Sequence, residues 1–382
     1  MKHPVEVWLD DARPGCARLQ RFVGPAGIVQ AHRPQDVPAA LEALESARSR
    51  GLHAAGYFTY ELGLLLEPRL RALLPSDRAL PLLWFGLFEA CEEVAPDVFA
   101  AQIAGRAYAG PLKHEWDARE YAGRFARVHD YIEAGDIYQA NLSFRSRFAF
   151  LGDPRALYWA LRERSAAAHC AYVDDGTWQF LSLSPELFFD LANDGTLTAK
   201  PMKGTAPRGS DALADAARRA ALRASEKDRA ENLMIVDLLR NDLGRIGKLG
   251  SVRVEDLFAV ETYPTVHQMV STVKAGLIPD TPIEDIVRAL FPCGSVTGAP
   301  KIRAMEIIAE LEASPRGVYC GAIGHFAPDR SARFNVAIRT LTLRGGQGEL
   351  GIGGAIVQDS TAASEYAECL LKARYYDASR RS

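Results

Sequence analysis

The segment at residues 170–200, CAYVDDGTWQFLSLSPELFFDLANDGTLTAK, holds four short apolar runs separated by turn residues. Asp174-Asp175-Gly176 and Asn193-Asp194-Gly195 are typical of tight hairpin turns, in which glycine supplies a positive φ angle. We therefore expect four consecutive strands that pair in the antiparallel direction, at residues 170–173, 178–183, 187–191 and 196–200.

The chain on either side of this segment mixes helices and strands. Apolar residues at helical spacing predict helices at residues 37–50, 117–134, 154–165, 211–223, 226–241, 283–290, 301–312 and 363–378. Further strands are expected at 5–9, 54–60, 82–89, 138–150, 250–254, 266–274, 334–343 and 349–358, and residues 95–111 are expected to be a connecting loop. Strands joined by hairpins, with helices outside, indicate an α+β protein with antiparallel sheets rather than a Rossmann fold.

The composition excludes several classes of protein. The 382 residues are 48% hydrophobic and carry a net charge of −3 without a basic block, so we expect no nucleic-acid binding. The longest apolar runs, such as residues 62–66 and 80–87, are too short to span a membrane. The first residues lack the apolar region of a signal peptide, and the six cysteines form no Cys-x-x-Cys pair. These features favour reduced thiols and a cytoplasmic location.

The stretch 199–209, AKPMKGTAPRG, places Lys203 after a short strand and within a turn that Pro201 and Pro207 make stiff. A lysine held in a dry cleft loses stabilisation of its charge, so its pKa falls and it can become a nucleophile. The alternative is a solvated lysine on a surface loop.

Two helices are each expected to carry an acidic pair at i, i+3 spacing, which places both carboxylates on one helix face. The first pair is Asp228 and Glu231, and the second is Glu365 and Glu368. Two such helices could meet around a hard cation such as Mg²⁺, which prefers oxygen ligands. Alternatively, both are solvated faces, and Asp228 completes a capping box with Ser225.

Residues 291–305, FPCGSVTGAPKIRAM, form a glycine-rich loop that runs into a helix. Exposed backbone N–H groups at such a position favour an anion, although a plain strand-to-helix connection has the same pattern. Arg339 lies in a predicted strand and, if it points inward, needs an anionic partner. His267 lies on an apolar strand, where it is either a core residue or a pocket residue.

Together these motifs resemble those of the chorismate-utilising enzymes. PMKGT at 201–205 is similar to the PIKGT motif of the members called aminodeoxychorismate synthase component I, and residues 227–245, 291–305 and 364–372 are similar to three long motifs of the superfamily. The resemblance covers residues 115–378 strongly and the first hundred residues weakly. It implies antiparallel sheets packed as a sandwich, with residues 1–112 as a variable N-terminal region of the same sheets and 113–382 as the chorismate-binding catalytic region.

The resemblance also implies roles for individual residues. Lys203 would attack the chorismate ring, and Glu186 would be the general acid for the departing hydroxyl. Glu231 and Glu368 would bind Mg²⁺ directly, while Asp228 and Glu365 would act through water. Further substrate-binding positions match the superfamily motifs, and they are Thr205, His267, Ser295, Thr297, Gly298, Tyr319, Arg339, Gly353, Gly354 and Lys372.

The implied reaction converts chorismate and ammonia to 4-amino-4-deoxychorismate, for the synthesis of 4-aminobenzoate and folate. The sequence has no Gly-x-Cys-x-Gly elbow of a glutaminase, so ammonia would come from a separate glutamine amidotransferase subunit. One alternative is anthranilate synthase component I, which usually carries alanine at the position of Lys203; another is an inactive scaffold that binds the amidotransferase. Gln139 stands where isochorismate-forming members carry a lysine that activates water, which disfavours a water-using reaction.

Overall fold

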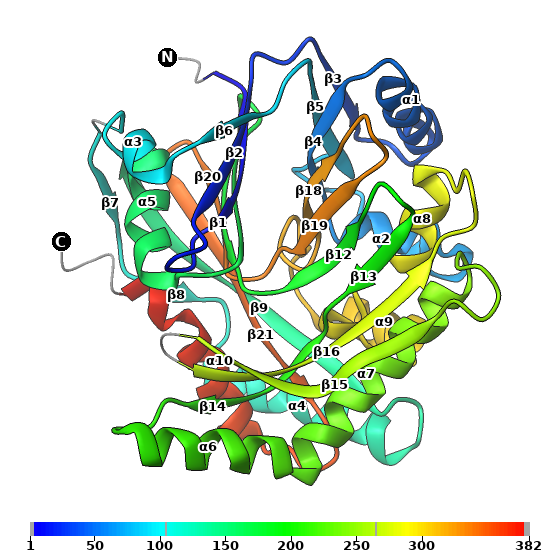
Figure 1. The fold of residues 1–382 in the computed structure, drawn as a ribbon. Coiled ribbons are helices and arrows are strands. Elements are labelled where there is room, and N and C mark those ends of the chain that lie inside the picture. Colours follow the sequence, from blue (N-terminus) through cyan, green and yellow to red (C-terminus); the bar gives the residue numbers. More distant parts are fainter. Residues whose placement is uncertain (1–3, 104, 264–265, 378–382) are drawn as a thin grey trace.

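The computed structural model describes residues 4–103, 105–263 and 266–377. Its strands form one sheet of 11 strands and a second sheet of 10, and neighbouring strands in both sheets run antiparallel (Figure 1). The predicted α+β class with large antiparallel sheets is confirmed. The two sheets are called the first and the second sheet below.

The first sheet is built around the long strand β9. Across the sheet the order is β17 (Gly298–Ala299), β9 (Gln139–Gly152), β21 (Gln347–Ile356), β20 (Thr340–Arg344), β11 (Gln179–Ser184), β10 (His169–Asp174), β1 (Glu6–Asp11), β2 (Arg18–Val23) and β6 (Glu92–Val94). Two short strands, β7 (Ala107–Ala109) and β8 (Lys113–His114), also pair with β9.

The second sheet joins strands from the N-terminal and central parts of the chain. Its order is β14 (Met202–Pro207), β16 (Val266–Gly276), β13 (Thr196–Ala199), β12 (Leu187–Leu191), β19 (Ala332–Val336), β18 (Ala322–Phe326), β4 (His53–Phe58), β5 (Leu83–Phe88) and β3 (Gly27–Ala31). A tenth strand, β15 (Arg253–Thr262), pairs with β16.

Apolar side chains from the two sheets meet between them. Tyr57 of β4 packs on Phe180 of β11 with ring centroids 4.6 Å apart, in a buried cluster that also contains Val7 and Ile323. Side chains along a strand alternate between the two faces of its sheet, so each sheet also carries apolar side chains on the face that points away from the other sheet. Helices cover these outer faces. The second sheet shares its core with α1 (Val37–Ser49), α7 (Glu226–Gly244) and α8 (Ile283–Leu290), and the first with α4 (Ala118–Glu133), α5 (Pro154–Ser165) and α10 (Ala362–Asp377).

The remaining helices join these layers or lie at their edges. α9 (Lys301–Leu311) contributes buried side chains to both helix-covered cores, for example Met305 to one and Ile307 to the other. The shorter or peripheral helices are α2 (Glu61–Leu66), α3 (Pro96–Ala100), α6 (Ala212–Ala224) and the 3-10 turns at Pro34–Asp36, Pro68–Leu73 and Gly294–Val296.

One predicted strand is wrong in a way that matters for function. Residues 334–343 are not a single strand but two, β19 and β20, which belong to different sheets. Between them Arg339 has a positive φ of 50°, which redirects the chain from the second sheet to the first. Arg339 therefore does not lie in a strand as predicted, and the alternation of side chains typical of a strand does not decide which way it points.

Other segments also differ from the predictions. Residues 95–111 contain α3 and β7 rather than only a loop, and β2 and β3 were not predicted. The stretch 199–209 is not a turn, because residues 202–207 form β14 and pair with β16. Residue 378, the last of the predicted closing helix, lies outside the described residues.

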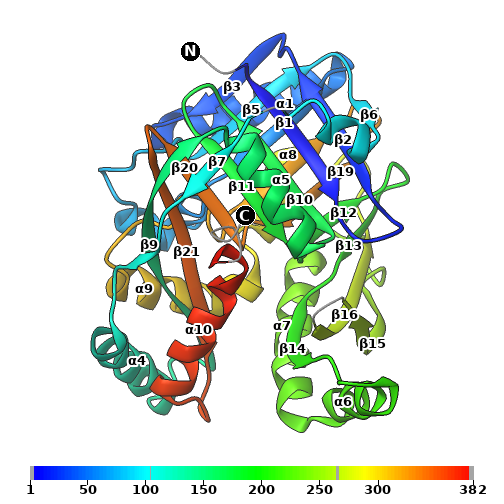
Figure 2. The same cartoon turned by 90° about the vertical axis from the view of Figure 1, so that its left-hand side faces the viewer.

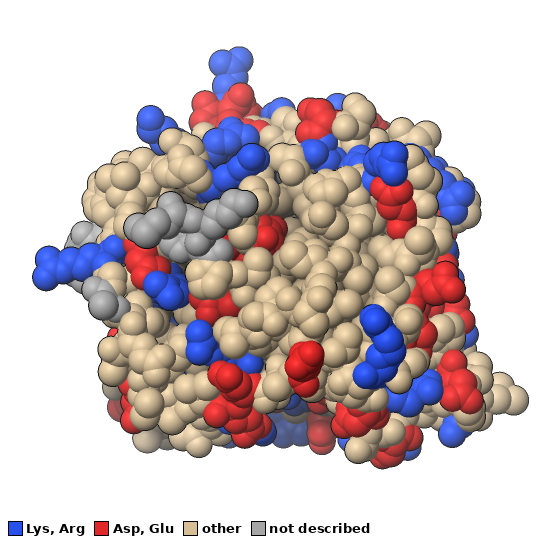
Figure 3. All heavy atoms as spheres, turned by 90° about the horizontal axis from the view of Figure 1, so that it is seen from above, with Lys and Arg blue, Asp and Glu red and all other residues tan. Residues whose placement is uncertain are grey.

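The first hundred residues add strands to both sheets, since β1 pairs with β10 and β4 with β18. The boundary at 112/113 stays a prediction. None of the described helices combines the length and the apolar character that crossing a membrane requires. On the face shown in Figure 3, acidic and basic side chains intermingle, and neither sign forms a continuous patch there.

Candidate active site

The chain crosses between the two sheets twice at one place. β11 leads through Glu186 into β12, and β19 leads through residues 337–339 back into β20. The amide of Val336 donates to the carbonyl of Glu186 at 3.1 Å, and the amide of Leu183 donates to the carbonyl of Arg339 at 3.0 Å. The two crossings therefore lie side by side and fix the backbone of both predicted site residues.

The Glu186 side chain is buried, with 5% of its surface exposed, and its Oε1 atom has no hydrogen-bond partner among the described residues. Burial raises the pKa of Glu186 to about 7, and the Ser295 hydroxyl and the Lys203 ammonium oppose this rise. A carboxyl group with this pKa is partly protonated at neutral pH and can donate a proton. The geometry thus suits the predicted general acid.

Lys203 lies on β14 at an irregular part of its pairing with β16, where the register shifts between Met202 and Thr205. The next residue, Gly204, has φ of 88°, and a Cβ atom there would lie 2.9 Å from Cβ of Asp228 on α7. Only glycine fits this backbone conformation and this close contact. The stiff turn expected around Lys203 is instead a distorted edge strand that rests on α7.

The charges around Lys203 come from three separate parts of the chain. Burial lowers the pKa of Lys203; Glu231 of α7 opposes this, and Lys372 of α10 lowers the pKa further. Glu186 acts on Lys203 in the same way as Glu231, by favouring the charged amine. The structure therefore brings the predicted nucleophile and the predicted general acid within electrostatic range, and it shifts the lysine pKa in the direction that nucleophilic attack needs.

The two acidic pairs lie on α7 and α10, on opposite sides of the view in Figure 2. Burial raises the pKa of Glu231, and the charges of Asp228 and Glu365 raise it further. Because Glu365 belongs to α10, its influence on Glu231 indicates that the acidic groups of the two helices lie within electrostatic range of each other. The Ser225 side chain accepts a hydrogen bond from the Asp228 amide at 3.3 Å, so Ser225 caps α7. The Ser225 amide donates to the Leu222 carbonyl at 3.2 Å rather than to the Asp228 carboxylate, so the cap is not the capping box of the alternative prediction.

No three Asp, Glu, His or Cys side chains converge into a metal-binding group within the described ranges. Mg²⁺ nevertheless needs few protein ligands, because it keeps several waters and is usually held by one or two carboxylates. Four carboxylates from two facing helices are a donor set of that kind. The predicted division into direct ligands, Glu231 and Glu368, and water-mediated ones, Asp228 and Glu365, is compatible with this chemistry and stays a prediction.

Lys372 connects α10 with the first sheet. Its Nζ atom lies 2.8 Å from Oε1 of Glu368 and donates to the carbonyl of Gly353 at 3.3 Å. A Cβ atom on Gly354 would lie 3.4 Å from Oε2 of Glu365 and 3.7 Å from Nζ of Lys372. The two glycines of β21 therefore border the acidic pair of α10, as their predicted place in the pocket requires.

The glycine-rich loop reaches the same site through Ser295. This residue is buried, and its hydroxyl lowers the pKa of Glu186 by hydrogen bonding. The Thr297 hydroxyl instead donates to the backbone carbonyls of Cys293 and Gly294, at 3.2 and 3.3 Å. Gly298 has φ of 151°, and a Cβ there would lie 2.1 Å from the Gln139 carbonyl oxygen, so Gly298 allows the loop to pair with β9.

Arg339 has no ion pair or hydrogen bond from its guanidinium to another described residue. Burial lowers its pKa, and Tyr375 of α10 opposes this. An arginine that is largely buried without an anionic partner is poised to bind the carboxylate of a ligand. The anionic partner predicted for Arg339 is thus not found among the described residues, and its substrate-binding role stays a prediction.

Two predicted substrate-binding residues are engaged elsewhere. The buried ring of His267 contacts the Thr262 hydroxyl through Nδ1 at 3.0 Å and the Asp215 carboxylate through Nε2 at 2.9 Å. Both ring nitrogens therefore have partners in the protein, as in the core-residue alternative. The Thr205 hydroxyl is exposed and donates to Gln268 at 3.0 Å.

The structure adds residues that sequence reasoning did not select. Arg145 of β9 is buried; its guanidinium lies 5.3 Å from the ring centroid of Tyr319, and a Cβ on Gly351 would touch both side chains. Gln139, noted above for its chemical type, is fully buried, and neither polar atom of its side chain has a partner within the described residues. The alternation of side chains along β9 predicts on which face of the sheet each side chain lies. It does not predict which residues of other elements that side chain contacts.

Comparisons with known proteins identify the family of this chain. The model of the chorismate binding enzyme family matches residues 6–376. Over 264 residues the chain is 46% identical to the aminodeoxychorismate synthase of Streptomyces griseus, a match that covers 69% of this chain and 36% of that protein. Over 340 residues it is 40% identical to aminodeoxychorismate synthase component 1 of Klebsiella aerogenes, which covers 84% of this chain and 75% of that protein.

The fold has a similar counterpart among solved structures. The crystal structure of anthranilate synthase component I from Streptococcus pneumoniae TIGR4 superposes with a TM-score of 0.81 at 25% sequence identity, and the match covers 100% of this chain and 93% of that one. The chain belongs to the chorismate binding enzyme family. It spans about a third of the length of the Streptomyces griseus relative.

Proposed function

We propose that this chain converts chorismate and ammonia to 4-amino-4-deoxychorismate. The observation that carries the proposal is the grouping of Lys203 and Glu186. Burial lowers the lysine pKa and raises the glutamate pKa to about 7, so the two shifts favour an uncharged amine and a protonated carboxyl group near each other. Relatives named aminodeoxychorismate synthase, at 40–46% identity, support the same assignment.

In the first step the neutral Lys203 amine attacks the chorismate ring. A carbon–nitrogen bond forms, the ring carbon–oxygen bond breaks, and Glu186 transfers its proton to the departing hydroxyl, which leaves as water. Ammonia then attacks the ring, and its bond to carbon replaces the bond to lysine. Lys203 is released as an amine, and the product carries an amino group where the hydroxyl was.

Substrate carboxylates would be held at the two ends of the site. Arg339 offers an unpaired guanidinium for one of them. At the other end Glu231 and Glu368 would hold Mg²⁺, with Asp228 and Glu365 acting through water. The bound ion would supply the positive charge that neutralises a ring carboxylate.

The amino donor would be ammonia delivered by a separate glutamine amidotransferase subunit, in the cytoplasm. The name component 1 on the Klebsiella aerogenes relative supports a multi-subunit enzyme. The product would feed the synthesis of 4-aminobenzoate and folate.

The second candidate is anthranilate synthase component I, which the structural similarity to the Streptococcus pneumoniae enzyme favours. Lys203 argues against it, because a direct attack by ammonia needs no lysine at this position. The test is to incubate the pure chain with chorismate, Mg²⁺ and an ammonium salt and to identify the product by mass spectrometry. Formation of 4-amino-4-deoxychorismate supports the proposal, and formation of anthranilate overturns it.

A further inference from the structure

A cavity of about 520 Å³ lies apart from the catalytic residues, at an open end of the space between the sheets. Its wall on the first sheet is formed by Arg147 of β9, Glu349 of β21 and Arg344 of β20, which stand on neighbouring strands. The loops at residues 77–80 and 314–318 form the opposite wall. Neither Lys203 nor Glu186 lines this cavity.

The cavity combines a flat aromatic wall with cationic groups. The Arg344 guanidinium lies over the Trp178 ring, 4.7 Å from its centroid, and forms no ion pair with another residue in the described part of the chain. Arg147 is exposed over 58% of its side chain and contacts Glu349 at 3.5 Å. Leu80 and Val318 supply apolar surface between these groups. Guanidinium groups bind carboxylates in a planar geometry, and a guanidinium stacked on an aromatic ring is held in a fixed orientation.

Three acidic residues line the cavity, Glu61, Asp77 and Glu349, and two of them, Glu61 and Glu349, are already engaged. The buried Glu61 carboxylate accepts hydrogen bonds from the backbone amides of Arg316 and Gly317, at 2.7 to 3.2 Å. The Glu349 carboxylate lies 3.0 Å from Nε of Arg145 and 3.5 Å from Nε of Arg147. On the wall formed by the first sheet, the groups left to meet a ligand are therefore cationic and apolar, while the Asp77 carboxylate belongs to the opposite wall.

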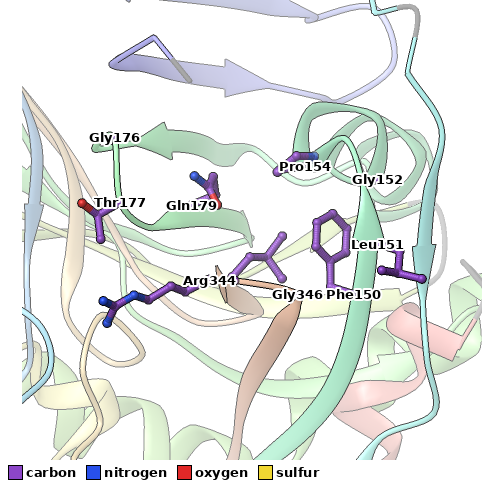
Figure 4. A pocket seen from close by; sticks show the side chains of 11 residues that line it. Phe150, Leu151, Gly152, Pro154, Gly176, Thr177, Gln179, Arg344 and Gly346 are labelled. Atoms are coloured by element: carbon purple, nitrogen blue, oxygen red, sulfur yellow. The ribbon is translucent and has the colours of Figure 1, made fainter. Parts of the chain in front are cut away.

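A neighbouring cavity of about 590 Å³ lacks this combination. It lies at the ends of β9 and of the β10–β11 and β20–β21 hairpins, and Arg344 is the one charged residue among those that line it (Figure 4). Phe150, Leu151 and Pro154 line it together with the neutral polar residues Thr177 and Gln179 (Figure 4). Within the described parts of the chain it has no second charged group to orient a ligand, so the smaller cavity is the better candidate.

We propose that the cavity between Trp178 and Arg147 binds a small aromatic carboxylate. The ring would lie against Trp178, Leu80 and Val318, and the carboxylate would meet Arg344 and Arg147. The site is connected to the substrate pocket, because Arg145 contacts Glu349 on one side and the Tyr319 ring on the other. A ligand that draws Arg147 away from Glu349 therefore changes the environment of Arg145 and Tyr319, and with it the affinity for chorismate.

The test is an isothermal calorimetric titration of the whole chain with benzoate and, separately, with 4-aminobenzoate. Chorismate is left out of both titrations. Arg344→Met removes the stacked guanidinium and is expected to weaken binding about tenfold, as loss of a charge-assisted hydrogen bond does. Arg147→Met is a second variant for the same site. Arg219→Met, an exposed arginine of α6, is the matched control and should bind like the wild type. Aniline, which has the ring without the carboxylate, should not bind.

Arg339→Met separates this site from the substrate pocket, and it should leave benzoate binding unchanged. No heat of binding at millimolar benzoate, or wild-type affinity in both Arg344→Met and Arg147→Met, overturns the proposal. Loss of binding in Arg339→Met would also overturn it, since the ligand would then occupy the chorismate pocket. The titration needs no turnover, so its outcome is independent of the proposed function.

Discussion

The Nζ atom of Lys372 lies 2.8 Å from Oε1 of Glu368, one helical turn away on α10. Burial acts to raise the pKa of Glu368, but the charge and hydrogen bond of Lys372, together with the charges of Lys203 and Lys227, outweigh it and the pKa is lowered. Lys372 therefore neutralises a carboxylate that is proposed to bind Mg²⁺, and a cation that arrives at Glu368 has to compete with the ammonium group.

The first prediction concerns this competition. Lys372→Met removes the competing charge, so Mg²⁺ should bind several-fold more tightly, as expected for loss of about 1 kcal/mol of repulsion at a partly exposed site. Calorimetric titration with MgCl₂ in the absence of chorismate measures this. Glu368→Gln should bind Mg²⁺ more weakly than the wild type while it unfolds at the same temperature. Unchanged Mg²⁺ affinity in both variants would exclude Glu368 as a ligand.

The second prediction concerns the pH dependence of stability. Glu186 has a pKa of 4.5 in an unfolded chain and about 7 in the folded protein, so the folded state binds its proton more tightly. The stabilisation is complete below about pH 4.5 and is lost as pH rises through 7, and it amounts to about 3 kcal/mol. Glu186→Gln cannot titrate, so the wild type should lose stability relative to this variant between pH 5 and 8. Urea unfolding measures the difference, and parallel profiles for the two proteins would contradict the raised pKa.

The third prediction concerns the loop that carries Ser295. The buried Arg316 guanidinium donates to the carbonyls of Val296 and Asn141, at 2.7 and 2.6 Å, and pairs with Glu312 at 2.6 Å. Arg316→Met leaves Glu312 buried without its partner, which should cost about 3–5 kcal/mol of unfolding free energy. Chemical denaturation checks this, with the exposed pair Arg240 and Asp237 as control, since Arg240→Met should cost less than about 1 kcal/mol. A loss of similar size in both variants would refute the structural role of Arg316.

The fourth prediction concerns the amino donor. The isolated chain should consume chorismate with ammonium salts, faster at alkaline pH because more ammonia is neutral, and it should be inert with glutamine alone. Chorismate consumption measured by absorbance separates the two donors. Activity of the pure chain with glutamine as sole donor would show that it contains a glutaminase.

The sequence predicted most helices and the α+β class, because the amphipathic patterns and hairpin turns are local signals. β14 was missed because Pro201, Gly204 and Pro207 disfavour a strand, and only pairing with β16 overrides that preference. The crossing at Arg339 depends on a positive φ angle in a residue type that rarely adopts one, so the local pattern resembled a continuous strand.

The candidate site was predicted only in part, and mostly from motifs. Motif resemblance selected Lys203 and Glu186, and the structure places them within electrostatic range of each other. Motif resemblance could not reveal that both ring nitrogens of His267 contact other side chains, because one partner, Asp215, is distant in sequence. Arg145 was missed for the same reason, since its contact with Tyr319 is made between strands and loops far apart in the chain.

The central claim is that Lys203 is a covalent nucleophile and not merely a binding charge. With an unperturbed pKa near 10.4, roughly 0.04% of a lysine is neutral at pH 7, so the lowered pKa of Lys203 is a requirement of the mechanism. Lys203→Arg keeps the positive charge but cannot attack, because a guanidinium stays protonated.

The most direct measurement is the intact mass of the protein after incubation with chorismate and Mg²⁺ without ammonia. The account predicts that the wild type gains the mass of one chorismate less one water, and that Lys203→Arg and Lys203→Ala gain nothing. An unmodified wild type, together with synthesis of 4-amino-4-deoxychorismate by Lys203→Arg once ammonium is added, would contradict it.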